Sequence, residues 1–500
     1  MIDEFNVPAP SAETTEARKR AESFSYEHTA AVRESYDNSI LNTDSYKMSH
    51  WKQYPPGAEK VYSYIESRGG EFDRLVFFGL QSFIKRYLMK PITKQDINLA
   101  EVLTKAHGLM FNRSGWEYIL KVHGGRLPLS IKAVKEGTVV PPHIPLVTVE
   151  NTDPNCAWVT SFGETPILRA VWYPSTVATV SYHAKIIIYK YLVDTCDNPD
   201  DQIAFKLHDF GYRGVSSKES GELGGLGHLI NFMGTDTMGA LAEAIVSYNA
   251  TGPVGYSIPA AEHSTITSWG RDSEKAAYEN MIDQFGGEGK MYAVVSDSYN
   301  IYNAVEHIWG EELKDKVLEK GGCLVVRPDS GNPADVVLQT INMLGSKFGF
   351  TVNRKGFKVL NAAVRVIQGD GINLNSIEEI CLTLRANGWS IENIAFGMGG
   401  GLLQSVNRDT LKWAMKCSAI CINGKWQDVY KDPITDPGKA SKRGRFAVIT
   451  DGNGYEVVNQ DFNAWRDHLR EVYRNGRLLI DDTFESIRAR SRKAMPESKK

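Results

Sequence analysis

Short apolar runs recur through the second half of the chain, and each is followed by a turn and then by a stretch with helical periodicity. The clearest runs cover residues 291–295, 323–326, 364–367 and 393–396. They are apolar throughout, which is typical of parallel strands that helices cover on both sides. Successive turns are roughly 30–40 residues apart, close to the ~31 residues per unit of an eight-unit βα barrel. The pattern predicts an α/β protein with a βα barrel over residues 181–409.

The apolar residues between 60 and 150 are grouped in short β-type runs instead. Two of these runs, 129–134 and 146–149, alternate between apolar and polar positions, and a third covers 61–65. Alternation favours half-buried antiparallel strands. We therefore expect a mixed domain over residues 39–180, and we expect the C-terminal segment 410–490 to pack with it.

Both ends of the chain are polar. Residues 1–38 are rich in Ala, Glu, Ser and Arg and predict a poorly ordered extension, while residues 488–500 predict a charged, solvated tail. The N-terminus lacks the basic start and apolar run of a signal peptide, and no apolar run approaches the ~18–20 residues of a membrane span. A cytoplasmic location without a membrane partner is the expectation.

Composition narrows the range of partners. The 500 residues are 42% hydrophobic and 23% charged, with a net charge of −3, so nucleic acid or an anionic membrane is not expected as a bulk partner. A phosphate ligand would need a local cluster of Lys and Arg. The six cysteines show no paired CxxC spacing, which favours reduced thiols over disulfides or a zinc site.

Acidic or glycine-rich turns follow the barrel strands. Asp297, Asp329 and Asp370 come after three successive runs, and Gly399–Gly401 follows the next. In a barrel these strand ends converge on one face, where carboxylates hold Mg²⁺ or sugar hydroxyls and glycines let backbone N–H groups approach a phosphate. The alternative, that each acid only caps the following helix, stays open.

Other side chains are candidates for phosphate, proton transfer and base stacking. Arg offers phosphate a planar fork and Lys a point charge, while a histidine among small polar residues can act as a nucleophile or move a proton. Flat aromatic rings stack on heteroaromatic bases. The candidates are Arg213, Arg327, Arg408 and Lys416 for phosphate, His263 for proton or phosphoryl transfer, and Phe210 and Tyr46 for stacking. Taken singly, each has the alternative of an ordinary surface or core residue.

A series of longer motifs points to one family. The motifs are TDSYK (43–47), KQYPP (52–56), VYSY (61–64), LHDFGYRGVSS (207–217), GTDT (234–237), GYSIPAAEHST (255–265), RPDSGNP (327–333) and IQGDG (367–371). In this order and spacing, from about residue 38 to about 490, the chain resembles the nicotinamide phosphoribosyltransferases of the type II phosphoribosyltransferase family.

The resemblance implies a reaction and an architecture. The reaction joins nicotinamide to 5-phosphoribosyl pyrophosphate, with Mg²⁺, giving nicotinamide mononucleotide and pyrophosphate in NAD salvage. The architecture is an irregular βα barrel beside a second mixed α/β domain, in a homodimer whose active sites lie at the subunit interface. The resemblance also implies that ATP phosphorylates His263 and that ATP hydrolysis is coupled to product formation.

The resemblance also implies a role for each site residue. Phe210 and the partner's Tyr46 sandwich the pyridine ring, and Asp236 accepts a hydrogen bond from the carboxamide. Asp297 and Asp329 contact Mg²⁺. The residues that hold the ribose are Arg327, Asp329, Gly369 and Asp370, with Pro328 and Ser257 as further substrate-binding candidates. The residues that hold the 5′-phosphate are Gly399, Gly400 and the partner's Arg408 and Lys416. Arg213 and His263 face the pyrophosphate. Two positions, Ala414 and Met398, depart from the family pattern.

Three alternative functions are weighed. A nicotinate phosphoribosyltransferase shares the architecture, but Asp236 would repel a carboxylate substrate. Phosphoribosyltransferases of the common type carry paired acids before Thr-Gly, and RPDSG (327–331) lacks that pair. A non-catalytic ligand sensor on the same scaffold would be expected to lose His263, Asp329 or Asp370, and all three are present.

Overall fold

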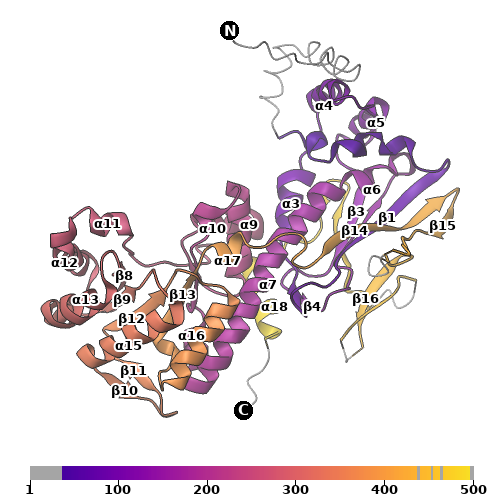
Figure 1. The fold of residues 1–500 in the computed structure, drawn as a ribbon. Coiled ribbons are helices and arrows are strands. Elements are labelled where there is room, and N and C mark those ends of the chain that lie inside the picture. Colours follow the sequence, from indigo (N-terminus) through magenta and orange to yellow (C-terminus); the bar gives the residue numbers. More distant parts are fainter. Residues whose placement is uncertain (1–36, 436–439, 452–453, 462–465, 496–500) are drawn as a thin grey trace, which may run out of the picture.

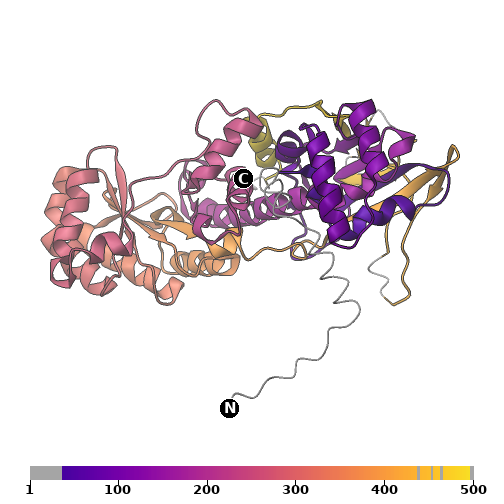
Figure 2. The same ribbon diagram turned by 90° about the horizontal axis from the view of Figure 1, so that it is seen from above.

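A computed structural model describes residues 37–435, 440–451, 454–461 and 466–495. It has two parts, a barrel domain and a sheet domain, which lie end to end with the long helix α7 (Glu164–Thr195) running between them (Figures 1 and 2). The predicted N-terminal extension, apart from its last two residues, lies outside the described residues. The predicted boundary at residue 180 falls inside α7, so one helix belongs to both parts.

The barrel domain is built on six parallel strands in the order β7-β6-β13-β12-β9-β8. They are β6 (Leu207–Asp209), β7 (Gly234–Thr235), β8 (Met291–Val295), β9 (Cys323–Arg327), β12 (Val364–Gln368) and β13 (Ile394–Met398). The four predicted runs correspond to β8, β9, β12 and β13. The irregular βα barrel expected from the sequence is confirmed.

An extended segment, residues 256–261, closes the barrel between its two edge strands. The amide of Thr235, in β7, donates to the carbonyl of Tyr256 at 3.0 Å, and the amide of Ala293, in β8, donates to the carbonyl of Pro259 at 2.8 Å. Both bridges are parallel. The sheet therefore curls round on itself, which brings its carboxyl-terminal strand ends toward one another.

Helices cover the outside of the barrel, and three of them begin at a polar side chain that caps the first turn. Asn332 accepts from the amide of Asp335, with Pro333 in the first helical position as predicted, and Asn373 and Ser217 cap two other helices in the same way. These helices are α9 (Lys218–Leu229), α10 (Met238–Tyr248), α12 (Glu274–Phe285), α15 (Pro333–Phe348) and α16 (Leu374–Ala386). The apolar faces of α12, α15 and α16 form one core with the strands, whereas α9 and α10 pack with α7 in a second cluster.

The sheet domain is a seven-stranded antiparallel sheet in the order β15-β14-β1-β5-β3-β18-β19. Its strands are β1 (Ala58–Ser67), β3 (Leu129–Ala133), β5 (Val147–Asn151), β14 (Trp413–Ile422), β15 (Lys425–Asp428), β18 (Arg470–Arg474) and β19 (Arg477–Leu478). The segment 410–490 thus supplies four strands to a sheet that the N-terminal part begins. Helices α4 (Lys94–Ala106) and α5 (Arg113–His123) pack beside it (Figure 1).

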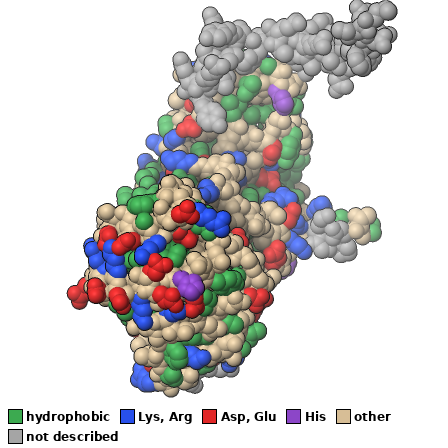
Figure 3. Space-filling view, turned by 60° about the vertical axis from the view of Figure 1, so that its left-hand side comes forward, with side chains coloured by type: hydrophobic (Ala, Val, Ile, Leu, Met, Phe, Trp, Pro, Cys, Tyr) green, Lys and Arg blue, Asp and Glu red, His purple; other side chains and the backbone are tan. Residues whose placement is uncertain are grey.

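Short elements complete the fold. Three pairs of strands form small two-stranded sheets: β2 (Leu75–Val76) with β4 (Val139–Val140), β10 (Phe350–Val352) with β11 (Lys358–Leu360), and β16 (Phe446–Thr450) with β17 (Tyr455–Asn459). No helix among the described residues is both long and apolar enough to cross a membrane. On the face seen in Figure 3, acidic and basic side chains are interspersed over the barrel domain, so this face carries no field of a single sign.

The prediction of a charged tail from residue 488 is wrong for its first part. Helix α18 (Phe484–Lys493) buries Phe484 and Ile487 completely against the barrel domain, and Ser491 lies on the same face. Arg488 donates to the carbonyls of Leu229 and Val254 at 2.8 and 2.6 Å. The charges follow the outer face of an amphipathic helix, and the apolar face was too sparse to reveal it. Residues 496–500 lie outside the described residues.

Candidate functional site

A cleft of about 1140 Å³ opens where the barrel strands end at their carboxyl termini. Its walls come from the turns after β6, β7, β9, β12 and β13 and from the start of α11 (His263–Thr267). Most of the predicted site residues line it: Phe210, Arg213, Asp236, His263, Arg327, Asp329, Gly369, Asp370, Gly399 and Gly400. The strand-end residues predicted from the sequence, apart from Asp297, therefore lie together along one cleft.

Phe210 lies across the mouth of the barrel because two neighbouring strands carry glycine beneath it. A Cβ at Gly397 would lie 2.8 Å from the ring atom Cζ of Phe210 and closer still to Cε2, and a Cβ at Gly369 would lie 3.1 Å from Cε2. The amide of Phe210 donates to the carbonyl of Met398 at 3.1 Å, which fixes its backbone. Below the ring, small and branched side chains fill the barrel: Ala293, Val325, Ile367, Ala395 and Ile258. The result is a flat apolar surface suited to stacking a heteroaromatic ring.

Asp236 stands at one side of this surface and is held by two donors. Its Oδ1 accepts from His208 Nε2 at 3.0 Å and from Ser257 Oγ at 2.5 Å. Burial alone would raise the pKa of Asp236, but the hydrogen bond and charge of His208, the hydroxyl of Ser257 and the charge of Arg327 lower it below its usual value. Asp236 is therefore a carboxylate, and it can accept a hydrogen bond from an amide.

His263 faces two carboxylates on the opposite side of the cleft. Its Nε2 lies 3.7 Å from Asp297 Oδ1 and 3.6 Å from Asp329 Oδ2, and its Nδ1 lies 3.3 Å from Ser298 Oγ. Asp329 is also paired with Arg327 at 3.1 Å. The imidazole is about half exposed, at 47%. It is thus both accessible and oriented by acidic neighbours, as a nucleophilic or proton-transferring histidine requires.

The two predicted metal ligands fit a divalent cation. Asp297 Oδ2 accepts from Ser330 Oγ at 2.5 Å, but Asp297 Oδ1 is buried and has no hydrogen-bond partner among the described residues. A buried, unpaired carboxylate oxygen is unfavourable unless a cation or donor satisfies it. Since Asp329 Oδ2 approaches the same imidazole nitrogen, the two acids together offer the oxygen ligands that Mg²⁺ prefers.

Several predicted residues lie outside the cleft. Tyr46 is 57% exposed in a short 3-10 helix (Ser45–Lys52) of the sheet domain. Arg408 and Lys416 line a second cavity of about 680 Å³ in the same domain. Ser257 reaches the cleft only through Asp236, and Pro328 does not line it.

The second cavity is strongly basic, and the sequence revealed only part of it. Arg68, Lys412 and Lys431 join Arg408 and Lys416 in its wall. Burial, followed by the charges of basic neighbours, lowers the pKa of Lys416 even though Glu164 raises it. Lys412 lies between the predicted Arg408 and Lys416, whereas Arg68 and Lys431 are distant from them in the chain, and none of the three carries a local motif. The pairing of β1 with β14, which sets Tyr64 opposite Lys416, brings the segment of Arg68 close, and the pairing of β14 with β15 brings the segment that precedes Lys431.

The two departures from the family pattern differ in position. Ala414 is buried and lines the basic cavity, so it affects the volume available to an anion there. Met398, the last residue of β13, is fully buried in the core between the barrel strands and the surrounding helices. Its glycine neighbours line the cleft instead.

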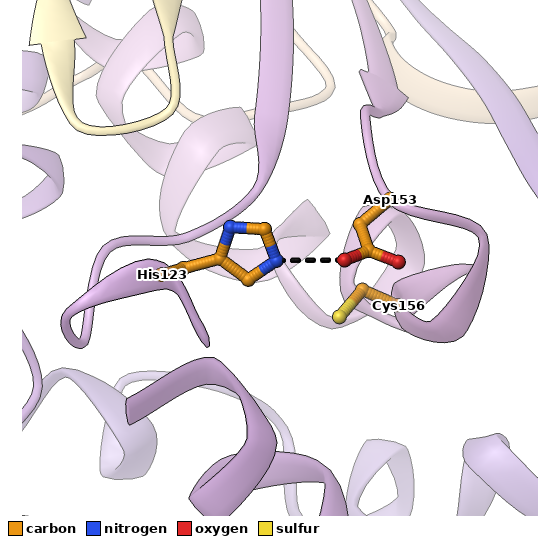
Figure 4. A group of neighbouring side chains, drawn as sticks. All are labelled: His123, Asp153 and Cys156. Carbon is orange, nitrogen blue, oxygen red and sulfur yellow. Dashed lines mark hydrogen bonds and ion pairs between the residues drawn. The ribbon is translucent and has the colours of Figure 1, made fainter. Parts of the chain in front are cut away.

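One group of metal-ligand types occurs elsewhere among the described residues, at His123, Asp153 and Cys156 in the sheet domain (Figure 4). Asp153 already accepts from His123 Nε2 at 2.8 Å, from the Tyr118 hydroxyl at 3.0 Å and from the amide of Asn155 at 2.8 Å. Burial raises the pKa of the Cys156 thiol to about 12. Hydrogen bonding and capping account for this group, and the residues do not line the cleft.

Comparisons with known proteins agree with this geometry. Residues 205–477 match the model of the nicotinate phosphoribosyltransferase (NAPRTase) family, and residues 38–131 match that of the nicotinamide phosphoribosyltransferase N-terminal domain. The chain is 53% identical over 460 residues to a nicotinamide phosphoribosyltransferase from Xanthomonas campestris, covering 91% of this chain and 98% of that protein. It is 30% identical to one from Acinetobacter baylyi, covering 91% and 97%.

Solved structures with low sequence identity share the fold. A nicotinate-nucleotide pyrophosphorylase from Pyrococcus furiosus superposes with a TM-score of 0.59 at 15% identity, covering 91% of this chain and 95% of that one. The human nicotinic acid phosphoribosyltransferase gives 0.55 at 16% identity, covering 90% and 93%.

Proposed function

The chain belongs to the nicotinamide phosphoribosyltransferase family, and we propose that it joins nicotinamide to 5-phosphoribosyl pyrophosphate, releasing pyrophosphate and forming nicotinamide mononucleotide for NAD salvage. The observation that supports the choice of base is Asp236, an ionised carboxylate beside the flat surface of Phe210. It accepts from a carboxamide but repels a carboxylate. A substrate carboxylate ~4 Å from Asp236 meets about 4 kcal/mol of repulsion at an effective dielectric of about 20.

The cleft residues divide the chemistry between them. Phe210 and Asp236 hold the base so that its ring nitrogen faces the ribose carbon. As pyrophosphate leaves, positive charge develops on the ribose ring, and the carboxylates of Asp329 and Asp370 stabilise it. Arg213 and Arg327 stabilise the negative charge of the departing group. Mg²⁺ held by Asp297 and Asp329 would add a positive charge against pyrophosphate oxygens.

A pyrophosphate-release assay with nicotinamide, nicotinate and quinolinate tests this function. We expect nicotinamide to be turned over with a preference near a thousandfold over nicotinate, the equivalent of the repulsion at Asp236. Equal turnover of nicotinate and nicotinamide would refute the assignment and favour a nicotinate phosphoribosyltransferase.

We further propose a homodimer in which each cleft is completed by the partner's basic cavity. The cleft lacks the exposed Tyr46 and the cations of the sheet domain, and helix α10 beside Asp236 presents an apolar face to solvent, with Met238 at 70% and Val246 at 68% exposure. A second copy would bury this face and supply the missing groups.

Complementation tests the shared site. Asp329→Asn disables the cleft of a subunit, and Lys416→Ala disables the basic cavity that it offers to its partner, so each variant homodimer should be inactive. When the two variants are mixed, each heterodimer has one intact site, so the mixture should recover about a quarter of wild-type activity. No recovery, with light scattering showing that dimers exchange, would contradict a shared site.

We also propose that ATP phosphorylates His263. Support comes from its exposure and its position between Asp297 and Asp329. A neutral imidazole nitrogen would bond to the terminal phosphorus of ATP while the P–O bond to ADP breaks, and the remaining ring proton can pass to a neighbouring carboxylate. Incubation with ATP should leave an acid-labile phosphate on the wild type and none on His263→Ala. An unlabelled wild type that still turns nicotinamide over would separate this proposal from the main activity.

A further inference from the structure

The imidazole of His208 is the only titratable side chain that hydrogen-bonds Asp236 among the described residues. His208 lies on β6, and its alternation along the strand turns it into the barrel together with Phe210, whose ring centroid is 5.2 Å away. Its side chain is largely buried, at 14% exposure. It therefore sits behind the base-stacking surface, where it can act on a ligand only through Asp236.

The geometry fixes which nitrogen carries the proton. An ionised carboxylate only accepts hydrogen bonds, so Nε2 of His208 must be the donor to Asp236 Oδ1. Nδ1 points at the backbone of Gly234, where a Cβ would lie 2.7 Å from it. Glycine at position 234 thus leaves room for the imidazole in this orientation.

Both donors to Asp236 use the same oxygen. His208 and Ser257 each bond Oδ1, and no hydrogen bond to Oδ2 is found among the described residues. We infer that His208 is the positioning residue that sets the preference of this site for an amide over a carboxylate base, because its Nε2–H occupies Oδ1 and leaves Oδ2 to accept from the ligand. The inference rests on the proposed function and names a determinant of its selectivity.

The same pair makes selectivity depend on the charge of His208. With a neutral imidazole the pair carries one negative charge and repels a carboxylate base. With an imidazolium the pair is neutral overall and that repulsion falls, although the hydrogen bond remains. Selectivity for nicotinamide should therefore decrease when the imidazole takes up a proton.

Other titratable or charged groups lie near His208 and could also affect the pH profile. His228, on α9, is fully buried, and burial lowers its pKa to about 3, so it stays neutral in mild acid. Asp209 points toward α9 and accepts from the amide of Gly211 and the hydroxyl of Thr237. The positive charge of Arg327 lowers the pKa of Asp236. These groups remain in every variant of His208, so a change in the pH profile reports the imidazole itself.

The test measures kcat/KM for nicotinamide and for nicotinate from mildly acidic to mildly basic pH, because their ratio cancels every step that the two substrates share. In the wild type the ratio should fall as the pH decreases. In His208→Gln, which keeps a donor but cannot ionise, the ratio should stay level with pH. In His208→Ala, kcat/KM for nicotinamide should fall about tenfold, mainly through KM, because a hydrogen bond to a charged group is lost.

Controls separate the outcomes. His307→Gln removes an exposed imidazole whose described partner is Glu311 and should leave both ratio and profile unchanged. A His208→Gln profile that follows the wild type would overturn the inference, and so would unchanged selectivity in a folded His208→Ala. A wild type that turns over neither base would instead refute the proposed function. If the alanine variant does not fold, the glutamine profile still decides.

Discussion

Replacing Gly397 by alanine tests whether the base-stacking surface depends on a strand without a side chain. The added Cβ would lie 2.8 Å from Cζ of Phe210 and closer to two other ring atoms, well inside van der Waals contact. On the side of β12 the ring lies close to Gly369, where a Cβ would meet Cε2 at 3.1 Å. The alanine must therefore push the ring outward, into the space that the base would occupy.

Two effects set the magnitude. Overpacking of this kind costs about 1–3 kcal/mol of stability, and loss of stacking on one aromatic ring costs ~1–3 kcal/mol of binding. The KM for nicotinamide should rise about ten- to a hundredfold, while the KM for 5-phosphoribosyl pyrophosphate should change little. Steady-state kinetics with each substrate varied, together with thermal unfolding, measures both effects.

A matched control and a double variant make the reasoning refutable. Gly252→Ala introduces a Cβ that meets nothing within 4 Å and should leave both KM values unchanged. If the clash with the ring is the cause, adding Gly397→Ala to Phe210→Ala should cost little further, since the partner in the clash is gone. An unchanged KM for nicotinamide in Gly397→Ala, or fully additive effects in the double variant, would refute the explanation.

Three other substitutions probe charge and packing. Asp236→Asn should raise nicotinate turnover relative to nicotinamide by up to about a thousandfold, measured by pyrophosphate release, because about 4 kcal/mol of repulsion is removed; an unchanged ratio would contradict this. Burial raises the pKa of Glu136 from 4.5 to about 7, so the folded chain keeps a proton that the unfolded chain releases. The free energy of unfolding should therefore fall by about 3 kcal/mol, relative to that of Glu136→Gln, as the pH rises through this interval, and then level off. Urea titrations of both proteins across the interval measure this, and parallel curves of stability against pH for wild type and variant would argue against it. Ile487→Ala, at a fully buried position of α18, should lower the free energy of unfolding by about 2–5 kcal/mol, whereas the exposed Glu485→Ala should change it by less than about 0.5 kcal/mol; equal effects would mean that α18 is not packed.

Hydrophobic periodicity and turn residues predicted the parts of the site that lie in the turns directly after barrel strands. A buried parallel strand needs an apolar run, and the following turn needs glycine or a polar residue, so Asp329, Asp370 and Gly399 could be placed at one barrel face before the structure was known. The family motifs added Asp236 and gave Phe210 its place against the pyridine ring. These residues lie within a few positions of a strand end, where periodicity and turn chemistry are strong signals.

Features that depend on long-range pairing could not be predicted in the same way. The basic cavity needs Arg68 and Lys431 brought beside Lys416 by a sheet that joins distant segments. The need for glycine at position 397 is a need for space beneath a ring from another strand. Helix α18 was mistaken for a tail because it has few apolar positions and many charges, and its burial depends on the barrel domain against which it packs.

The segment 256–261 closes the barrel without being a regular strand, and this has a mechanical consequence. Few backbone hydrogen bonds join it to β7 and β8, so this seam should open at a lower free energy than the ladders around the rest of the ring. Ser257 lies near its start, and His263 follows its end by two residues. A base bound beside Asp236 and Ser257 would stabilise the hydrogen bonds of this segment and so restrict the motion of His263 beyond its other end. We expect amides in this segment to exchange with deuterium sooner than those of β12, and to slow down when nicotinamide is added.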